Sequence, residues 1–190
     1  RMPDVLKVSV GYFAAPDMDL IDLFIGSEGT LGVITTVTFR ALSPIPTTAL
    51  ALVPCRSEED ALALVAALRR EPAVAAIEHM DARCLEILRE DGADRRYDVR
   101  FPDGTALALL VQMELPPGTT EADAFSQIEV SLTPGAPDTA MGRVCRLLHA
   151  HGVFDDTEMA LPGNARRAEQ LIAVREAVPA GVNQRVGHAQ

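Results

Sequence analysis

After residue 46, segments with the hydrophobic pattern of a strand alternate with segments that have the hydrophobic pattern of a helix. Residues 47–54 are apolar and β-branched, which predicts a strand. Ser57 stands at the N-cap of a following helix, with acidic residues in its first turn and Pro72 as its stop. A second strand is predicted over 74–78, and Asp81 is the N-cap of a second helix. The first helix has one apolar stripe at helical spacing, formed by Ala61, Leu64, Val65 and Leu68.

Turn residues separate the elements that follow. We expect a hairpin of 97–101 and 105–113, a short helix around 125–132, a helix over 141–151, a strand over 153–160 and a helix from Asn164 to about Val178. The hairpin is predicted from Pro-Asp-Gly at 102–104, a turn signal between two strand-like runs. The order of strands and helices predicts an antiparallel sheet covered by helices, which is an α+β fold.

The chain changes in composition near residue 43. Up to Leu42 it is rich in glycine and β-branched residues, and Ser-Pro-Ile-Pro at 43–46 then restricts the backbone to extended conformations. We therefore expect a first domain segment over 1–46 and a second domain over 47–190. The chain opens on Arg1 without a start methionine and closes without a tail-like composition, so we expect it to be a piece of a longer protein.

Charge and cysteine usage exclude several classes of function. The 190 residues carry 17 Lys and Arg against 27 Asp and Glu, a net charge of −10, which argues against nucleic acid or an anionic membrane surface as partner. No apolar run approaches the ~20 residues of a membrane span. Three isolated cysteines give neither a disulfide framework nor a metal knuckle, so we expect a reducing, cytoplasmic environment and no metal.

A glycine-rich segment over residues 23–35 is the best candidate for a ligand site. Its glycines fall at 26, 29 and 32, with the hydroxyl side chains of Ser27 and Thr30 between them. Glycines let the backbone adopt positive φ and approach a ligand, and successive N–H groups can surround an anion. A phosphate P-loop is excluded because no Gly-Lys-Ser/Thr is present, and a Rossmann fingerprint is excluded because a β-branched run follows, which predicts a strand and not a helix. The remaining alternative is a plain turn that binds nothing.

Residues 24–35, Phe-Ile-Gly-Ser-Glu-Gly-Thr-Leu-Gly-Val-Ile-Thr, resemble the signature of FAD-linked oxidases of the vanillyl-alcohol oxidase superfamily. The similar branch contains glycolate oxidase FAD subunits, D-lactate dehydrogenases and D-2-hydroxyglutarate dehydrogenases. Weaker similarities to the same branch occur at Lys7 with Gly11-Tyr12, at 77–81, at 107–114 and at 175–179.

The resemblance implies an FAD-dependent oxidoreductase of a small 2-hydroxy acid such as D-lactate or glycolate. It implies that 1–46 is the C-terminal part of the FAD-binding domain and 47–190 an incomplete cap domain, with a homodimer or an electron-accepting subunit as possible partners. The cofactor would do the hydride chemistry. The residues that it places against FAD are Glu28, Gly29, Thr30, Leu31, Gly32, Val33 and Ile34.

The sequence also departs from the family pattern. Val8, Ser9 and Val10 replace polar residues that help to hold dicarboxylic substrates in relatives, and the motif that bears the catalytic histidines is missing. We therefore assign no catalytic residue and expect the chain by itself to be inactive. A non-catalytic, cap-like module for binding or subunit interaction is the alternative.

Four other residues are open to two interpretations. Arg175 either reaches a substrate carboxylate or forms a surface ion pair with Glu176 or Glu169. His149 and His151 have metal-pair spacing, but positions i and i+2 of a helix point to different faces and no third ligand is near. His79 is either a general base or a structural residue at the end of a strand.

Overall fold

The structure is a computed structural model, and it describes residues 11–41 and 47–187. The chain divides into two compact units, residues 1–43 and 44–190. Each unit is treated separately below.

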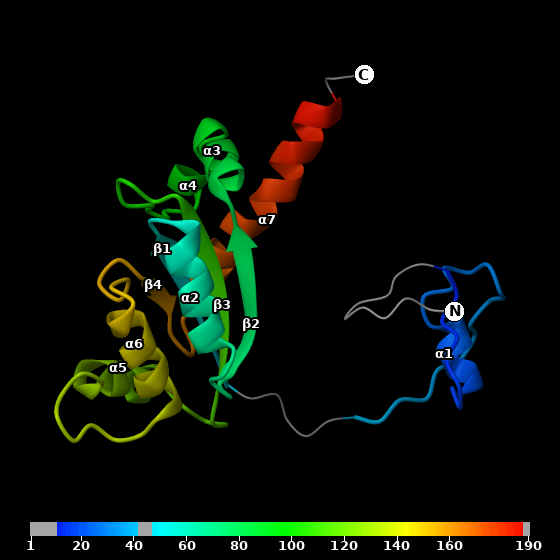
Figure 1. The fold of residues 1–190 in the computed structure, drawn as a ribbon, viewed down its shortest axis with the longest axis horizontal. Helices are drawn as coiled ribbons and strands as arrows, with labels where there is room; N and C mark the ends of the chain where they lie inside the picture. The colour runs from blue at the N-terminus through cyan, green and yellow to red at the C-terminus, as the bar shows by residue number, and fades with distance from the viewer. Residues whose placement is uncertain (1–10, 42–46, 188–190) are drawn as a thin grey trace. The chain divides into compact units, whose positions relative to one another are not determined.

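The second unit is built on a four-stranded antiparallel sheet in the order β2-β3-β1-β4 (Figure 1). Its strands are β1 (Thr47–Cys55), β2 (Val74–Met80), β3 (Leu107–Leu115) and β4 (Glu158–Ala160). β1 pairs with β3 and β4, and β3 also pairs with β2. The strands β1 and β2 are thus parallel with β3 between them, and β3 and β4 are parallel with β1 between them. The expected α+β fold with a helix-covered antiparallel sheet is confirmed, and its topology is a pair of split β-α-β units.

Helices cover both faces of this sheet. On the first face lie α2 (Glu58–Leu68), α5 (Glu121–Val130) and α6 (Ala140–Ala150), which pack on alternate residues of the central strands such as Ala51, Val53, Leu109 and Val111. On the second face lie α3 (Ala82–Glu90), α4 (Ala93–Arg96) and α7 (Ala165–Gly187), which pack on the other set, including Leu50, Leu52, Ala108 and Leu110. Because β1 and β3 are buried on both sides, their sequences are apolar almost throughout and do not alternate.

Several helices begin at the side chains that the sequence indicates. Ser57 accepts a hydrogen bond from the backbone N–H of Asp60, and Asp81 accepts one from that of Cys84. Asn164 accepts one from the N–H of Arg167 at the start of α7. These bonds satisfy helix-terminal donors that would otherwise lack a partner.

The predicted hairpin is wrong, although its turn exists. The N–H of Thr105 donates to the carbonyl of Pro102, but residues 97–101 form no strand. Both edges of β3 are already paired, one with β1 and the other with β2, so no edge remains for 97–101. The N–H of Arg100 donates instead to the carboxylate of Glu158 on β4, at 3.2 Å.

Three predicted boundaries also differ. The strand predicted over 153–160 is reduced to β4, because residues 154–156 form a turn, in which the N–H of Thr157 donates to the carbonyl of Phe154. The helix expected around 125–132 begins earlier, because Thr120 and Asp123 form a capping box at the start of α5. The helix expected to stop near Val178 continues through Pro179 to Gly187.

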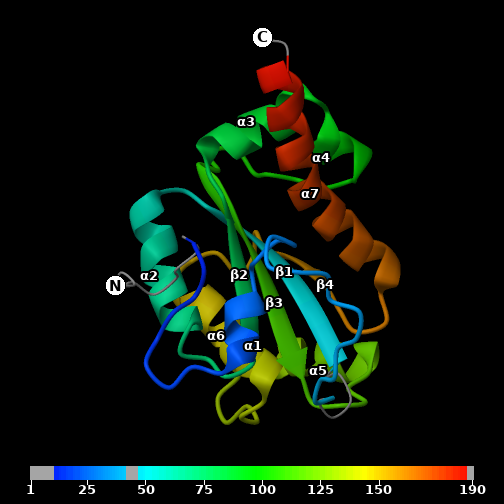
Figure 2. The same cartoon turned by 90° about the vertical axis from the view of Figure 1, so that its right-hand side faces the viewer.

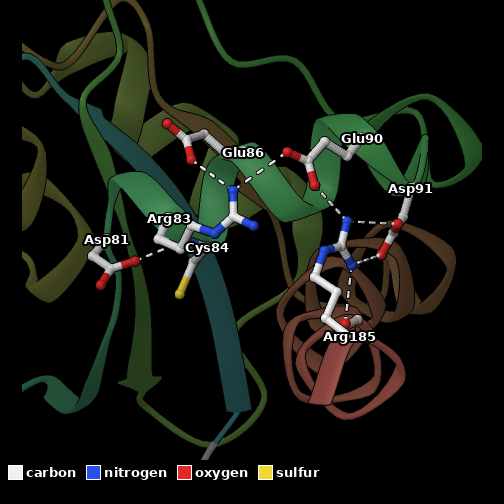
Figure 3. A network of polar contacts seen from close by, with 8 residues as sticks. Asp81, Arg83, Cys84, Glu86, Glu90, Asp91 and Arg185 are labelled. Atoms are coloured by element: carbon white, nitrogen blue, oxygen red, sulfur yellow. Dashed lines mark hydrogen bonds and ion pairs between the residues drawn. The ribbon is translucent and has the colours of Figure 1, made fainter. Parts of the chain in front are cut away.

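The second half of α7 is held against α3 by a close approach and a polar network. α7 runs from β4 past the sheet to α3 and α4 (Figure 2). Near its end, Arg185 donates to both carboxylate oxygens of Asp91, at 3.0 and 3.1 Å, and to Glu90 (Figure 3). Arg83 joins the network by donating to Glu86 and Glu90. The helices approach closely at Gly181, where an added Cβ would lie 2.5 Å from Cγ2 of Ile87.

The described part of the first unit, residues 11–41, contains one short helix. This helix, α1 (Leu20–Phe24), has a capping box formed by Asp19 and Asp22. The β-branched run from Val33 to Phe39 was expected to be a strand, but within 11–41 no strand is formed. A strand is held by hydrogen bonds to a neighbour, and in this run the side chains are exposed, Val33 to 92% and Phe39 to 80%.

Candidate functional site

The glycine-rich segment forms a compact turn directly after α1. Gly26, Glu28 and Gly29 have φ values of 77°, 51° and 78°, so three of four consecutive residues are in the left-handed region. The N–H of Ser27 donates to the carbonyl of Phe24, and that of Thr30 donates to the carbonyl of Ser27. Glu28 adopts a conformation that a residue with a Cβ rarely accepts, which indicates a constrained loop.

Thr30 and Tyr12 stabilise the turn from one side. The Thr30 hydroxyl donates to the carbonyl of Ser27 at 2.7 Å, and the Tyr12 hydroxyl lies 2.7 Å from the same Thr30 oxygen. Ser27 is buried, whereas the residues after it are exposed. Hydrogen bonds within the turn therefore fix its conformation, and the residues that follow Ser27 are exposed.

The predicted FAD contacts lie in one continuous exposed stretch, residues 28–34. Within 11–41 and 47–187, no acceptor pairs with the backbone N–H groups of Glu28, Gly29 or the residues 31–34. Among the residues that the structure describes, none has an atom within 4 Å of a Cβ built on Gly26 or Gly29, so this part of the structure leaves the space beside the turn open. Exposed N–H groups beside open space suit a phosphate or another anionic group.

A second candidate site lies on the second face of the sheet, where three segments far apart in the sequence meet. These are 77–81 at the end of β2, 107–114 in β3 and 175–179 in α7, the three later segments of the family resemblance. Each of them contributes residues to the lining of an open cavity of about 210 Å³. Its polar lining residues are Glu78, Gln112, Arg175 and Glu176, and its apolar lining residues include Leu50, Leu110 and Ile172.

An ion pair between Glu78 and Arg175 forms one wall of this cavity. Nε and Nη2 of Arg175 both contact the same carboxylate oxygen, Oε2 of Glu78. The pair also lines a neighbouring cavity of about 360 Å³, together with Cys84 and Pro179. The expectation of a pair with Glu176 or Glu169 is wrong within the described residues, because Arg175 extends toward the sheet and meets β2. The sequence indicated Glu78 only weakly, through its place in the segment 77–81.

His79 follows Glu78 directly in β2 and also lines the cavity of about 360 Å³, whereas His149 lies on α6. His79 is exposed and points to the first face of the sheet, opposite Leu109, beside a mainly apolar groove of about 390 Å³ that Leu62 and Ile77 also line. His149 lies edge-on to the ring of Phe154, with centroids 6.5 Å apart. In the part of the chain that the structure describes, no group of three His, Cys, Asp or Glu is arranged to hold a metal ion.

The cysteines are free thiols, and two belong to the core. Burial raises the pKa of Cys55 and of Cys145 to about 11, which keeps both thiols protonated and unreactive at neutral pH. Cys84 is half-buried, and burial raises its pKa as well. Among the described helices, none combines the length and the apolar character that crossing a membrane requires.

Comparison with known proteins finds that part of this chain is similar to a short stretch of D-lactate and D-2-hydroxyglutarate dehydrogenases. A D-lactate dehydrogenase of Archaeoglobus fulgidus is 33% identical over 90 residues, which are 47% of this chain and 19% of that protein. A probable mitochondrial D-2-hydroxyglutarate dehydrogenase of rice, in both the indica and japonica subspecies, is 35% identical over 71 residues. That match covers 36% of this chain and 13% of the rice protein. No family model matches the chain.

Proposed function

We propose that this chain is part of an FAD-dependent dehydrogenase or oxidase that acts on a small 2-hydroxy acid such as D-lactate or glycolate. The observation that carries the proposal is the partial match to a D-lactate dehydrogenase and to D-2-hydroxyglutarate dehydrogenases. In this proposal residues 1–46 belong to the FAD-binding domain and 47–190 to the cap domain. The free thiols favour the cytoplasm as its compartment.

The turn and the residues after it would hold the cofactor. The backbone from Glu28 to Ile34 offers exposed N–H groups to the dinucleotide, and Gly29 leaves room for it. Thr30 keeps the turn in shape through its bond to the carbonyl of Ser27. When bound, FAD supplies the acceptor for the hydride of the hydroxy acid, and the chain supplies position and charge.

Arg175 is the residue that we propose for the substrate carboxylate. A guanidinium binds a carboxylate through two parallel hydrogen bonds, and Arg175 lines a cavity that also offers an amide at Gln112 and an apolar wall. Counted at the ~30 Å³ that a water molecule occupies in the liquid, a molecule of six non-hydrogen atoms needs about 180 Å³. A hydroxy acid of the size of lactate therefore fits in the cavity of about 210 Å³.

The test of the cofactor site is Gly29→Val in the full-length protein that the gene encodes. Valine at φ 78° is strained, and its side chain occupies the space proposed for the dinucleotide, so we expect bound flavin to fall at least tenfold. Flavin absorbance per protein measures the loss. Dye reduction with D- and L-2-hydroxy acids then tests the activity.

The matched control is Gly135→Val. Gly135 has φ 77° and equally open surroundings, but lies in a surface turn of the second unit. Valine at this position imposes the same backbone strain in a turn outside the proposed cofactor segment. Full flavin occupancy in Gly29→Val, or an equal loss in Gly135→Val, would return the segment to a plain turn.

A further inference from the structure

The ion pair between Arg175 and Glu78 uses only one edge of the guanidinium. Glu78 Oε2 contacts Nε and Nη2, so the edge formed by these two nitrogens is taken. Within 11–41 and 47–187, no acceptor bonds to the other edge, formed by Nη1 and the second hydrogen of Nη2. A carboxylate can pair with that edge through two parallel hydrogen bonds while Glu78 stays in place.

Glu78 has the shorter side chain of the pair. It lies on β2 opposite Leu110 of β3, so the sheet fixes its backbone. Arg175 stands on α7 at the end of a longer side chain, and the two side chains are equally exposed, 41% for Arg175 and 42% for Glu78. A flexible, half-exposed arginine loses side-chain freedom when it binds a ligand, and a partner that already holds it removes much of that loss.

We propose that Glu78 is a positioning residue: it holds Arg175 by the Nε–Nη2 edge and leaves the Nη1–Nη2 edge ready for the carboxylate of a 2-hydroxy acid. This inference rests on the proposed function, because it takes Arg175 as the carboxylate ligand. It assigns to Glu78 a role in substrate affinity that is exerted through Arg175. The alternative is that the Glu78 carboxylate competes with the substrate for the guanidinium.

The two roles predict opposite effects of Glu78→Ala. A positioning residue, once removed, weakens binding, and we expect the dissociation constant of D-lactate to rise about tenfold, which corresponds to about 1.4 kcal/mol. A competitor, once removed, strengthens binding. Glu78→Gln keeps an acceptor oxygen in the same place, so it should retain part of the affinity that Glu78→Ala loses.

The experiment is a titration of the 190-residue chain with D-lactate, followed by amide chemical shifts in NMR. Lactamide, which lacks the carboxylate, serves as the neutral probe. Glu129→Ala on α5, an exposed residue of the opposite layer, is the matched control. Thermal unfolding of every variant reports whether the fold is intact. We expect Glu78→Ala to weaken lactate binding and leave lactamide binding unchanged.

A double-mutant cycle separates this inference from the proposed function. If Glu78 acts through Arg175, then Glu78→Ala has no further effect in the Arg175→Ala background. If Arg175→Ala binds lactate no differently from the wild-type chain, the proposed carboxylate site is wrong. If Arg175→Ala weakens lactate binding while Glu78→Ala leaves it unchanged or tightens it, only the positioning role is overturned.

Discussion

The close contact between α3 and α7 at Gly181 leads to a prediction whose sign depends on two opposing effects. Alanine favours a helix over glycine by about 1 kcal/mol, so Gly181→Ala on an open helix surface would stabilise the protein. Here the new Cβ would lie 2.5 Å from Cγ2 of Ile87 and 2.7 Å from a carboxylate oxygen of Asp91. Ile87 is buried and β-branched, so its methyl cannot rotate away, and Asp91 is held by Arg185.

Overpacking of this kind costs about 1–3 kcal/mol. Set against the helical preference of alanine, the expected result is a net loss of about 1 kcal/mol in the free energy of unfolding. For a protein of this size that lowers the Tm by about 2–4 °C. Circular dichroism during heating, together with urea unfolding, measures both quantities.

Gly187→Ala on the same helix is the control, because no atom of residues 11–41 or 47–187 comes within 4 Å of the added Cβ. We expect it to be neutral or slightly stabilising. Ile87→Leu removes the methyl that collides while it keeps the volume, so it should recover part of the loss when combined with Gly181→Ala. An unchanged or higher Tm for Gly181→Ala alone would show that α7 does not approach α3 this closely.

Two further predictions concern the buried acid of the second unit and the cysteines. Arg143 contacts both oxygens of the buried Glu71 at 2.9 Å, and these hydrogen bonds hold the pKa of the Glu71 carboxyl below its ordinary value of 4.5. The ion pair therefore stabilises the fold fully above pH 4.5, and this stabilisation disappears as the pH falls through the lowered pKa. Glu71→Gln should cost about 1–2 kcal/mol at pH 7. Urea unfolding should show this difference from the wild type shrinking as the pH falls below 4.5, and a difference that stays the same at every pH would contradict the reasoning. Alkylation at pH 8 should modify Cys84 faster than Cys55 or Cys145, because burial raises the pKa of the latter two thiols to about 11. Mass spectrometry measures the order of modification, and the opposite order would show that Cys55 or Cys145 lies outside the core.

The sequence predicted correctly those features that depend only on residues close together in the chain. Ser57, Asp81 and Asn164 were predicted as N-caps because a cap needs only its own side chain and an N–H three residues later. The predicted hairpin was wrong because strand pairing depends on residues distant in the sequence. Both edges of β3 are paired with strands that begin at residues 47 and 74. The last helix passed Pro179 because α3 holds its second half in place.

The second candidate site also depends on a contact between residues distant in the sequence, which the sequence alone does not predict. Arg175 could be singled out from the sequence as a carboxylate ligand, but its partner could not. Glu78 lies 97 residues away and reaches Arg175 only because β2 and α7 share one face of the sheet. The glycine turn, by contrast, is local, and its positive φ values at Gly26 and Gly29 follow from the residues themselves.

The strand order has a consequence for how the chain is made. Of the four strands of this sheet, β1 is synthesised first, yet its partners β3 and β4 begin only at residues 107 and 158. At ribosomal speeds of ~5–20 residues per second, β1 waits for seconds before β3 exists. Throughout that time a nine-residue segment without a single charge has no partner. Within the second unit, aggregation during synthesis should therefore begin at residues 47–55, and chaperones that bind apolar strands should act there before β3 is made.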